Sequence, residues 1–138
     1  MEHPRLALRR IPPDPVQFQV IFGSLLGDGR LVGRPRERRL RIAHSTSRAD
    51  YVRWKYDRLG PFAANPPETG NGLTGFQTVT HPLFDDLARL LGDPFARRDA
   101  IARLLRPLGL AVWLADVGRL DLSAEAFLPA QRELALVS

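Results

Sequence analysis

Val20-Ile-Phe-Gly-Ser-Leu-Leu-Gly-Asp-Gly29 is an apolar run that carries small residues and ends in one acid and a glycine. In a helix, Gly23 and Gly27 lie one turn apart on the same face, which lets a second helix pack closely. Gly29 suits the left-handed position that ends a helix. Asp28 would then lie at the negative end of the helix dipole, where a carboxylate is unfavourable unless a cation offsets it. The stretch alone fits a metal site, or a buried helix whose terminal acid points into water.

Composition predicts one soluble, cytoplasmic domain. The chain has 138 residues, enough for a single core. It has no cysteine, which excludes disulfides and thiolate metal sites, and its three histidines are too scattered to suggest zinc. No apolar run is long enough to span a membrane and no signal-peptide pattern is present, so we expect no membrane partner.

The positive charge is concentrated in the first half of the chain. Residues 1–60 carry 13 Lys or Arg and 6 Asp or Glu, a net +7, whereas residues 61–138 carry 7 and 9, a net −2. All of these basic residues except Lys55 are arginine, whose planar guanidinium suits phosphates and guanine edges. A GC-rich genome would explain arginine in place of lysine but not the clustering. The first half is therefore predicted to contact nucleic acid.

A basic β-hairpin is expected directly after the first helix. That helix should begin at Asp14-Pro15, an N-cap followed by proline at the first helical position. Strands over 30–32 and 38–44 follow, joined by a turn. In the second strand Arg39 and Arg41 share one face, opposite the apolar residues. The basic face either enters a DNA groove or protects an edge strand by charge.

The rest of the chain repeats part of this pattern. We expect a helix from Ser47 to Gly60, capped by Ser47 and Asp50, and then a loop over 60–75 and a strand over 75–80. Helices should follow over 82–92, 99–106 and 109–117. A short strand over 120–122 and a final helix within 123–138 complete the prediction. An apolar helix, a glycine and a strand thus occur twice, with 20–28 and 109–117 as equivalent helices.

Several segments in the same order resemble the LAGLIDADG homing endonucleases, a family also found inside inteins and introns. They cover most of residues 16–136 and comprise Phe22-Gly-Ser-Leu-Leu-Gly-Asp-Gly29, the pattern His44-Ser45, Tyr51, Trp54-Lys55-Tyr56 and Leu59-Gly-Pro61, then Thr78–Phe84, Leu108–Gly118 and Leu120–Leu134.

The resemblance implies an α+β fold, in which an antiparallel sheet carries helices on one face. We expect a single domain over 1–138, with a first repeat over 16–98 and a shortened second repeat over 99–138. The two motif helices would pair through Gly23, Gly27, Ala111 and Ala115. The implied activity is hydrolysis of phosphodiester bonds in double-stranded DNA with a divalent metal, for which Mg²⁺ fits.

The family's metal-binding acid matches Asp28 in the first motif but Val117 in the second. The resemblance therefore makes Asp28 the catalytic acid and metal ligand, with the Gly27 backbone and Asp116 as lesser ligands. Asp116 lies one position early, which is about 100° around a helix, and a solvated acid is the alternative. The expected DNA contacts are Arg30, Arg34, Arg36, Arg38, Arg39, Arg41, Arg48 and Lys55.

The departures from the family pattern leave several hypotheses open. After Val117 the sequence has 138 − 117 = 21 residues, too few for a second sheet. The first hypothesis is an endonuclease, either weakened or able to nick only one strand. The second is a DNA-binding remnant of a mobile element, and the third is a small domain whose basic face is incidental. A homodimer, in which each chain supplies one Asp28, is the remaining alternative.

Overall fold

The computed structural model describes residues 11–118, which form an α+β fold, as predicted. The helices are α2 (Pro15–Leu26), α3 (Ala49–Leu59), α4 (Pro82–Gly92), α5 (Pro94–Leu104) and α6 (Pro107–Asp116), with short 3-10 turns η1 (Thr46–Arg48) and η2 (Gly60–Phe62). The strands are β1 (Arg30–Val32), β2 (Arg39–Ser45), β3 (Glu68–Gly70) and β4 (Leu73–Gln77).

The strands form one antiparallel sheet in the order β1-β2-β4-β3. Along β2, Leu40, Ile42 and His44 are buried, whereas Arg41 is exposed on the other face. This alternation is the one that the sequence predicts for a half-buried strand. The sheet therefore has an inner face under the helices and an outer face that carries polar side chains.

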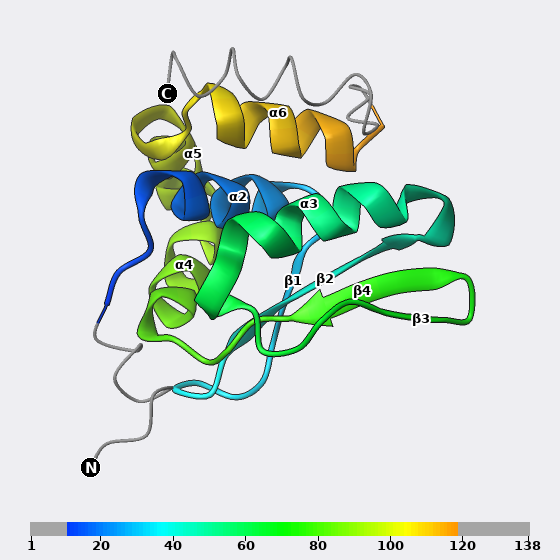
Figure 1. The fold of residues 1–138 in the computed structure, drawn as a ribbon. Coiled ribbons are helices and arrows are strands. Elements are labelled where there is room, and N and C mark those ends of the chain that lie inside the picture. Colours follow the sequence, from blue (N-terminus) through cyan, green and yellow to red (C-terminus); the bar gives the residue numbers. More distant parts are fainter. Residues whose placement is uncertain (1–10, 119–138) are drawn as a thin grey trace.

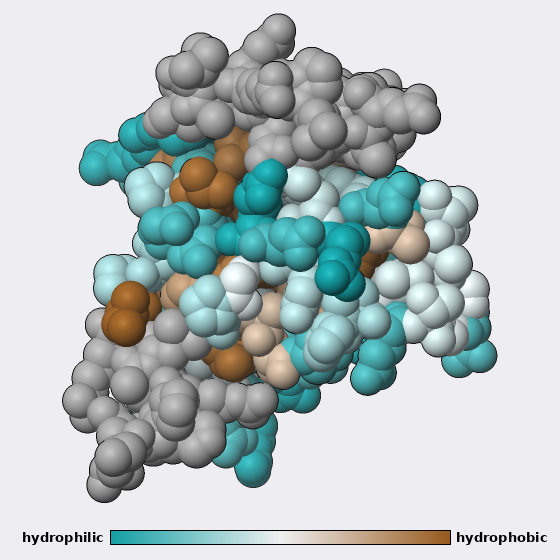
Figure 2. All heavy atoms as spheres, viewed as in Figure 1, coloured by the Kyte–Doolittle hydropathy of each residue, from teal (hydrophilic) through white to brown (hydrophobic). Residues whose placement is uncertain are grey.

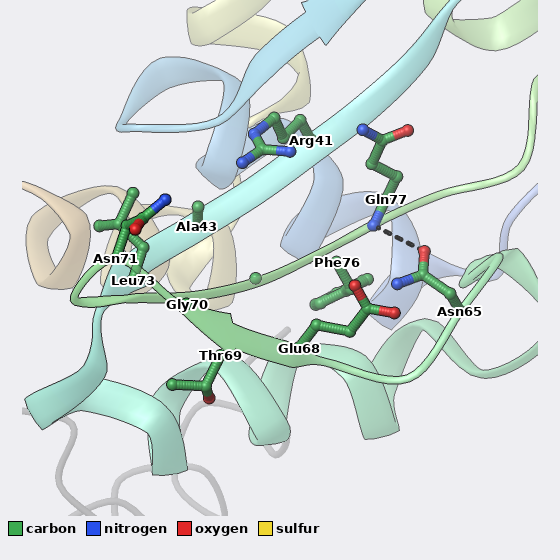
Figure 3. A pocket seen from close by; sticks show the side chains of 11 residues that line it. Arg41, Ala43, Asn65, Glu68, Thr69, Gly70, Asn71, Leu73, Phe76 and Gln77 are labelled. Atoms are coloured by element: carbon green, nitrogen blue, oxygen red, sulfur yellow. Dashed lines mark hydrogen bonds between the residues drawn. The ribbon is translucent and has the colours of Figure 1, made fainter.

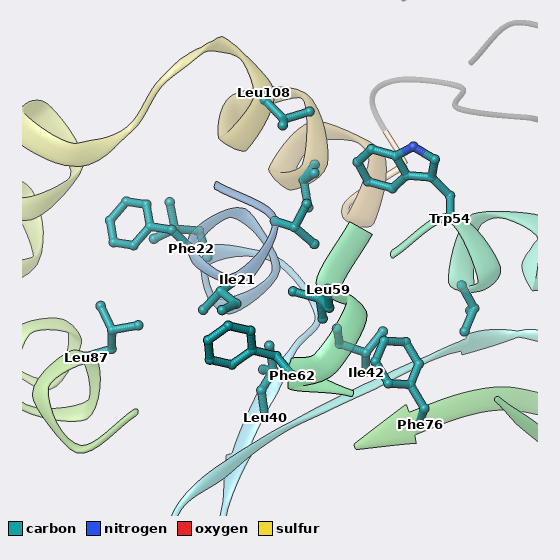
Figure 4. Close-up of a cluster of buried hydrophobic side chains, with 14 of the residues drawn as sticks. Ile21, Phe22, Leu40, Ile42, Trp54, Leu59, Phe62, Phe76, Leu87 and Leu108 are labelled. Atoms are coloured by element: carbon teal, nitrogen blue, oxygen red, sulfur yellow. The ribbon is translucent and has the colours of Figure 1, made fainter. Parts of the chain in front are cut away.

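The helices cover the inner face in layers. Figure 1 shows α2 and α3 over the sheet, with α6 packed against α2 on the side away from the strands. Apolar side chains from the helices, from β2 and β4 and from η2 converge between these layers (Figure 4). The labelled core residues are Ile21, Phe22, Leu40, Ile42, Trp54, Leu59, Phe62, Phe76, Leu87 and Leu108.

The sequence signals at the start of α2 work as expected. The Asp14 carboxylate accepts the Gln17 N–H at 2.7 Å, and the Gln17 side chain accepts the Asp14 N–H at 2.9 Å. Pro15 occupies the first turn, where its missing N–H costs nothing. The helix ends at Leu26 with Gly27 as its C-cap, so Asp28 lies just beyond the helix.

Several of the predicted elements differ from the structure, including the strand expected over 75–80, which is β4 and ends at Gln77. The Ser47 cap is wrong, because Ser47 lies in η1 and its hydroxyl pairs with that of Ser45. The expected loop 60–75 contains β3, which pairs with β4 through a turn at Asn71 and Gly72; both have positive φ (54° and 77°), the signature of a tight hairpin turn. α5 begins at Pro94 rather than at 99, because Asp93 caps it through the Ala96 N–H.

The shortened repeat expected over 99–138 is described only as far as residue 118. The strand predicted over 120–122 and the final helix lie outside the described residues.

Viewed as in Figure 1, the surface of the described part is mostly hydrophilic or neutral, with separate hydrophobic spots (Figure 2). Among residues 11–118, no helix combines the length and the apolar character that a membrane span requires.

Candidate metal centre and nucleic-acid interface

The backbone after α2 is tied down on both sides of Asp28. The Gly27 N–H donates to the Gly23 carbonyl at 3.0 Å, and the Gly29 N–H donates to the Ser24 carbonyl at 2.7 Å. Gly29 does not adopt a positive φ, so the expected left-handed cap is wrong. A glycine is needed for space instead, since a Cβ on Gly29 would lie 2.7 Å from the Ser24 oxygen. The Asp28 side chain is 53% exposed.

Asp28 lines a groove that runs onto the outer face of the sheet. This groove has a volume of about 700 Å³, and its wall includes Arg30, Arg41 and Arg48. A second hollow of about 500 Å³ adjoins it along β2, and both are lined by Arg41, Ala43 and Leu73. We call the two together the outer groove. The Asp28 carboxylate thus faces a surface groove that is lined by cations.

The floor of the outer groove is nearly free of large side chains. Ala43 pairs with Gly75 in the middle of the sheet, and a Cβ on Gly75 would lie 2.9 Å from the Ala43 Cβ. Arg41 lies between Arg30 and Gln77 in register and projects with Gln77 from the outer face (Figure 3). Guanidinium and amide groups over a flat floor are the donors and acceptors that read base edges.

The predicted DNA-binding arginines divide into two groups. Arg30 and Arg41 are exposed in the outer groove, and Arg39, half-buried, donates through Nε to the Gln77 Oε1 at 2.6 Å. Arg48 also lines the groove, but its Nη2 donates to the Ala115 carbonyl at 2.7 Å and its guanidinium lies over the Tyr51 ring. Arg48 therefore links the groove to the C-terminal end of α6.

The second group surrounds the turn between β1 and β2. Arg34 is highly exposed and pairs with Glu37 at 3.3 Å, and Arg38 pairs with Asp85 at 3.5 Å. Asp85 also accepts the backbone N–H of Arg36, which has a φ of 72°. The turn is thus fixed against α4, at the opposite end of β2 from His44.

Lys55, which the sequence analysis expects among the DNA contacts, lies in the interior. Its side chain is fully buried, and its Nζ donates to the Asp116 Oδ1 at 2.8 Å. The Nζ also lies over the Tyr51 ring, 4.7 Å from its centroid. Burial lowers the pKa of Lys55, and the charge and hydrogen bond of Asp116 oppose that shift. The reason for the burial is that Lys55 compensates an interior carboxylate.

That carboxylate belongs to Asp116, which the sequence analysis expects to be a lesser metal ligand or a solvated acid. Its side chain is 0% exposed, so it is neither solvated nor open to a metal ion. The Oδ1 accepts the Tyr51 hydroxyl at 2.6 Å in addition to Lys55, and the Oδ2 accepts the Asp28 N–H at 3.0 Å. Within residues 11–118 there is no group of three or more His, Cys, Asp or Glu that could hold a metal ion.

His44 lies between this buried network and Asp28. Burial, with the nearby charge of Lys55, lowers the pKa of His44 to about 4, so the ring is neutral at pH 7. Because the Lys55 ammonium can only donate, the His44 Nε2 accepts from it at 3.2 Å and the ring proton lies on Nδ1. This Nδ1 is 3.9 Å from the Asp28 Oδ2, too far for a direct hydrogen bond.

The motif helices α2 and α6 pack closely, and the α6 atoms nearest to Gly23 and Gly27 belong to Gly109, Val112 and Asp116. A Cβ on Gly23 would lie 2.8 Å from the Val112 Cβ, and one on Gly27 would lie 2.5 Å from the Asp116 Cβ. Ala111 and Ala115 are buried on α6. The small face of α2 is therefore covered within this chain, and a homodimer through that face would have to displace α6.

The family comparison matches the motif pair and the sheet together. The model of the LAGLIDADG DNA endonuclease family matches residues 18–134. The chain belongs to this family. Val117, which the sequence resemblance matches to the family's second acid, is 49% exposed at the end of α6.

Curated relatives of the LAGLIDADG chain carry the name Protein RecA. The chain is 35% identical over 109 residues to that of Mycolicibacterium chitae, covering 74% of this chain and 26% of the relative. It is 33% identical over 113 residues to that of Mycobacterium shimoidei, covering 77% and 26%. The chain thus spans about a quarter of the length of these relatives.

A solved structure shares the fold. The homing endonuclease I-WcaI bound to its DNA recognition sequence superposes with a TM-score of 0.62 at 18% identity, over 75% of this chain and 51% of that one. At this identity the likeness shows the shared α+β fold alone.

Proposed function

We propose that the chain is a Mg²⁺-dependent DNA endonuclease with one working acid, Asp28, and that it nicks one strand of double-stranded DNA. The observation that carries this proposal is the contrast between two acids. Asp28 is half exposed in a groove lined by three arginines, whereas Asp116 is buried and paired with Lys55.

The donor set at Asp28 fits a magnesium ion. Mg²⁺ takes one or two protein carboxylates and completes its shell with waters and substrate phosphates. Asp28 offers an exposed carboxylate, and the backbone carbonyl of Gly27 is the second ligand that we propose. A bound ion would supply charge stabilisation and a more acidic water for phosphodiester hydrolysis. Asp116 does not fit, because both of its oxygens accept hydrogen bonds from the protein.

The arginines of the outer groove would hold the DNA. Arg30 and Arg41 are exposed beside Asp28, where they can neutralise phosphates and keep the backbone near the carboxylate. Gln77 and Asn65 line the farther part of the groove and can read base edges. This division places phosphate contacts next to the acid and sequence recognition farther along the sheet.

A single acid favours nicking over a double-strand cut. Cleavage of both strands needs a metal-binding acid for each scissile phosphate, and the second motif offers Val117 where the first has Asp28. The similarity to about a quarter of each RecA relative supports a segment of the homing type, carried within or derived from a longer host protein.

The test is cleavage of a supercoiled plasmid that contains the DNA flanking the chain's own gene, with and without Mg²⁺. We expect nicked circles that disappear without Mg²⁺ and with Asp28→Asn. Asp57→Asn is the matched control, because the Asp57 side chain is also 53% exposed but pairs with Arg53 on α3. Loss of nicking in both variants, or a linear product from the native chain, would contradict the one-acid proposal.

The second candidate function is DNA binding without cleavage. The apolar Val117 and the buried Asp116 favour it, since the family's second acid is missing. It predicts no nicked product, together with DNA binding that weakens steeply with salt as condensed ions are released. Binding without salt dependence would instead favour a domain whose basic face is incidental.

A further inference from the structure

The acid of the second motif contacts the backbone of the first. Asp116 reaches across the α2–α6 contact, and its Oδ2 accepts the N–H of Asp28 at 3.0 Å. We propose that Asp116, held by Lys55 and Tyr51, is a positioning residue that fixes the peptide carrying Asp28 and so directs the Asp28 carboxylate into the outer groove. This inference rests on the proposed function of Asp28 as the metal-binding acid.

Three consecutive amides define the backbone at this point. Those of Gly27 and Gly29 donate to carbonyls of α2 itself, at 3.0 and 2.7 Å. The amide between them, that of Asp28, donates to α6 through Asp116. Local contacts therefore hold the two flanking peptides, and the orientation of the Asp28 peptide depends on a residue 88 positions away.

The other oxygen of Asp116 is held just as firmly. The Oδ1 accepts Lys55 at 2.8 Å and Tyr51 at 2.6 Å, both from α3. The Tyr51 hydroxyl also lies 3.2 Å from the Val112 carbonyl of α6. A carboxylate held by two donors from α3 cannot rotate freely, so its Oδ2 presents a fixed acceptor to Asp28.

Gly27 makes this arrangement possible. A Cβ on Gly27 would lie 2.5 Å from the Asp116 Cβ and 2.6 Å from its Oδ2. The first motif thus keeps a glycine where the second has an acid, and the side chain of the second occupies the space that the first leaves. Lys55 balances the buried charge, since an unpaired carboxylate in the interior would be strongly unfavourable.

The decisive experiment compares two double variants that both remove the ion pair. Lys55→Met with Asp116→Asn keeps an oxygen that can accept the Asp28 N–H, and its new NH₂ can donate to the Tyr51 oxygen. Lys55→Met with Asp116→Leu has similar size but no acceptor. Replacing a buried pair by apolar groups of similar volume is often tolerated, so thermal unfolding of each variant serves as the folding control.

The first measurement is NMR-detected hydrogen exchange of the Asp28 amide, without metal. We expect protection to fall at least about tenfold in the Leu variant relative to the Asn variant, while the Gly29 amide changes little in both. The second is the Mg²⁺ concentration for half-maximal nicking, which should rise about 10- to 100-fold in the Leu variant, the effect typical of losing a group that orients a metal ligand.

Equal exchange of the Asp28 amide in the two variants would overturn the proposal and leave Asp116 a structural residue. If the Leu variant does not fold, the native chain decides: an Asp28 amide that exchanges as fast as an unprotected loop amide overturns the proposal, and a protected one supports it. If the native chain does not nick DNA, the proposed function fails, while the exchange result still tests the positioning contact.

Discussion

At the end of α2 the acid Asp28 is half exposed and faces a groove lined by arginines, whereas at the end of α6 the acid Asp116 is fully buried. Beyond Asp116 the exposed position is Val117, an apolar residue. The resemblance to the family equates Asp28 with Val117, so Asp116 stands one position before the expected acid. At the end of α6 that difference of one residue separates a buried position from an exposed one.

The burial of the second acid changes the electrostatics of the site. Asp116 and Lys55 form a pair without net charge, and His44 beside them is neutral at pH 7 because its pKa is lowered to about 4. The buried pair therefore leaves the Asp28 carboxylate to face the arginines of the outer groove. Under the proposed function, a cation would lie between this acid and a phosphate. The four predictions that follow test this contrast between the two helix ends.

Removing the cation from the buried pair should have the largest effect. Lys55→Met leaves the Asp116 charge uncompensated in the interior, which costs about 3–5 kcal/mol of unfolding free energy. Urea unfolding measures the loss. In the double variant with Asp116→Leu, the free energy should return to within about 1 kcal/mol of the native value, because no charge remains to be paired. A single variant as stable as the native chain would show that Asp116 is not buried as an anion.

Restoring an acid to the exposed end of α6 should make the two ends alike. Val117→Asp places a carboxylate at the position that the family resemblance equates with Asp28, and we expect linear plasmid product to appear, with cleavage of the second strand faster than in the native chain by about 100-fold, which corresponds to about 2.7 kcal/mol of barrier. Val117→Asn is the control, since it has similar size and no charge. If Val117→Asp yields nicked circles without linear product, the ends differ by more than one side chain.

Adding a methyl group at the helix contact should weaken the pairing of the two ends. Gly23→Ala would place a Cβ against the backbone carbonyl of Gly109 and 2.8 Å from the Val112 Cβ, and such overpacking costs about 1–3 kcal/mol. Thermal unfolding compares this variant with Gly92→Ala on α4, where the added Cβ meets nothing within 4 Å and stability should be unchanged or slightly higher. Equal melting temperatures for the two variants would mean that α6 moves away from α2 without cost.

Much of this fold could be predicted because its signals are local. The capped start of α2, the alternation along β2 and the apolar pattern of α6 each lie within about a dozen residues, and the periodicity of each one defines its buried face. The turn at Asn71 and Gly72 was an available signal for β3, and Asp93-Pro94 was one for α5. Asp93-Pro94 follows the rule that correctly placed the start of α2, and Asn71-Gly72 follows the rule for two-residue hairpin turns.

The buried network could not be predicted in the same way. Lys55 and Asp116 are 61 residues apart, and no local pattern indicates that they meet. One signal was present: Lys55 lies four residues after Tyr51 and four before Leu59, so it shares the face of two residues that are buried. A basic residue on that face suggests an interior partner, but the sequence does not identify which acid it is.

The last prediction tests whether the end of α2 is also the end that holds DNA. Arg41→Ala removes one cation from the outer groove, so the affinity for double-stranded DNA should fall by up to about tenfold, and the salt dependence should decrease by about one released ion. Binding titrations across a range of salt concentrations measure both. Arg103→Ala is the control, because Arg103 is 77% exposed on α5 and pairs with Asp99 rather than lining the groove. If the two variants lower the affinity and the salt dependence equally, the DNA is held by diffuse charge. The position of Asp28 in the outer groove would then no longer support a role in cleavage.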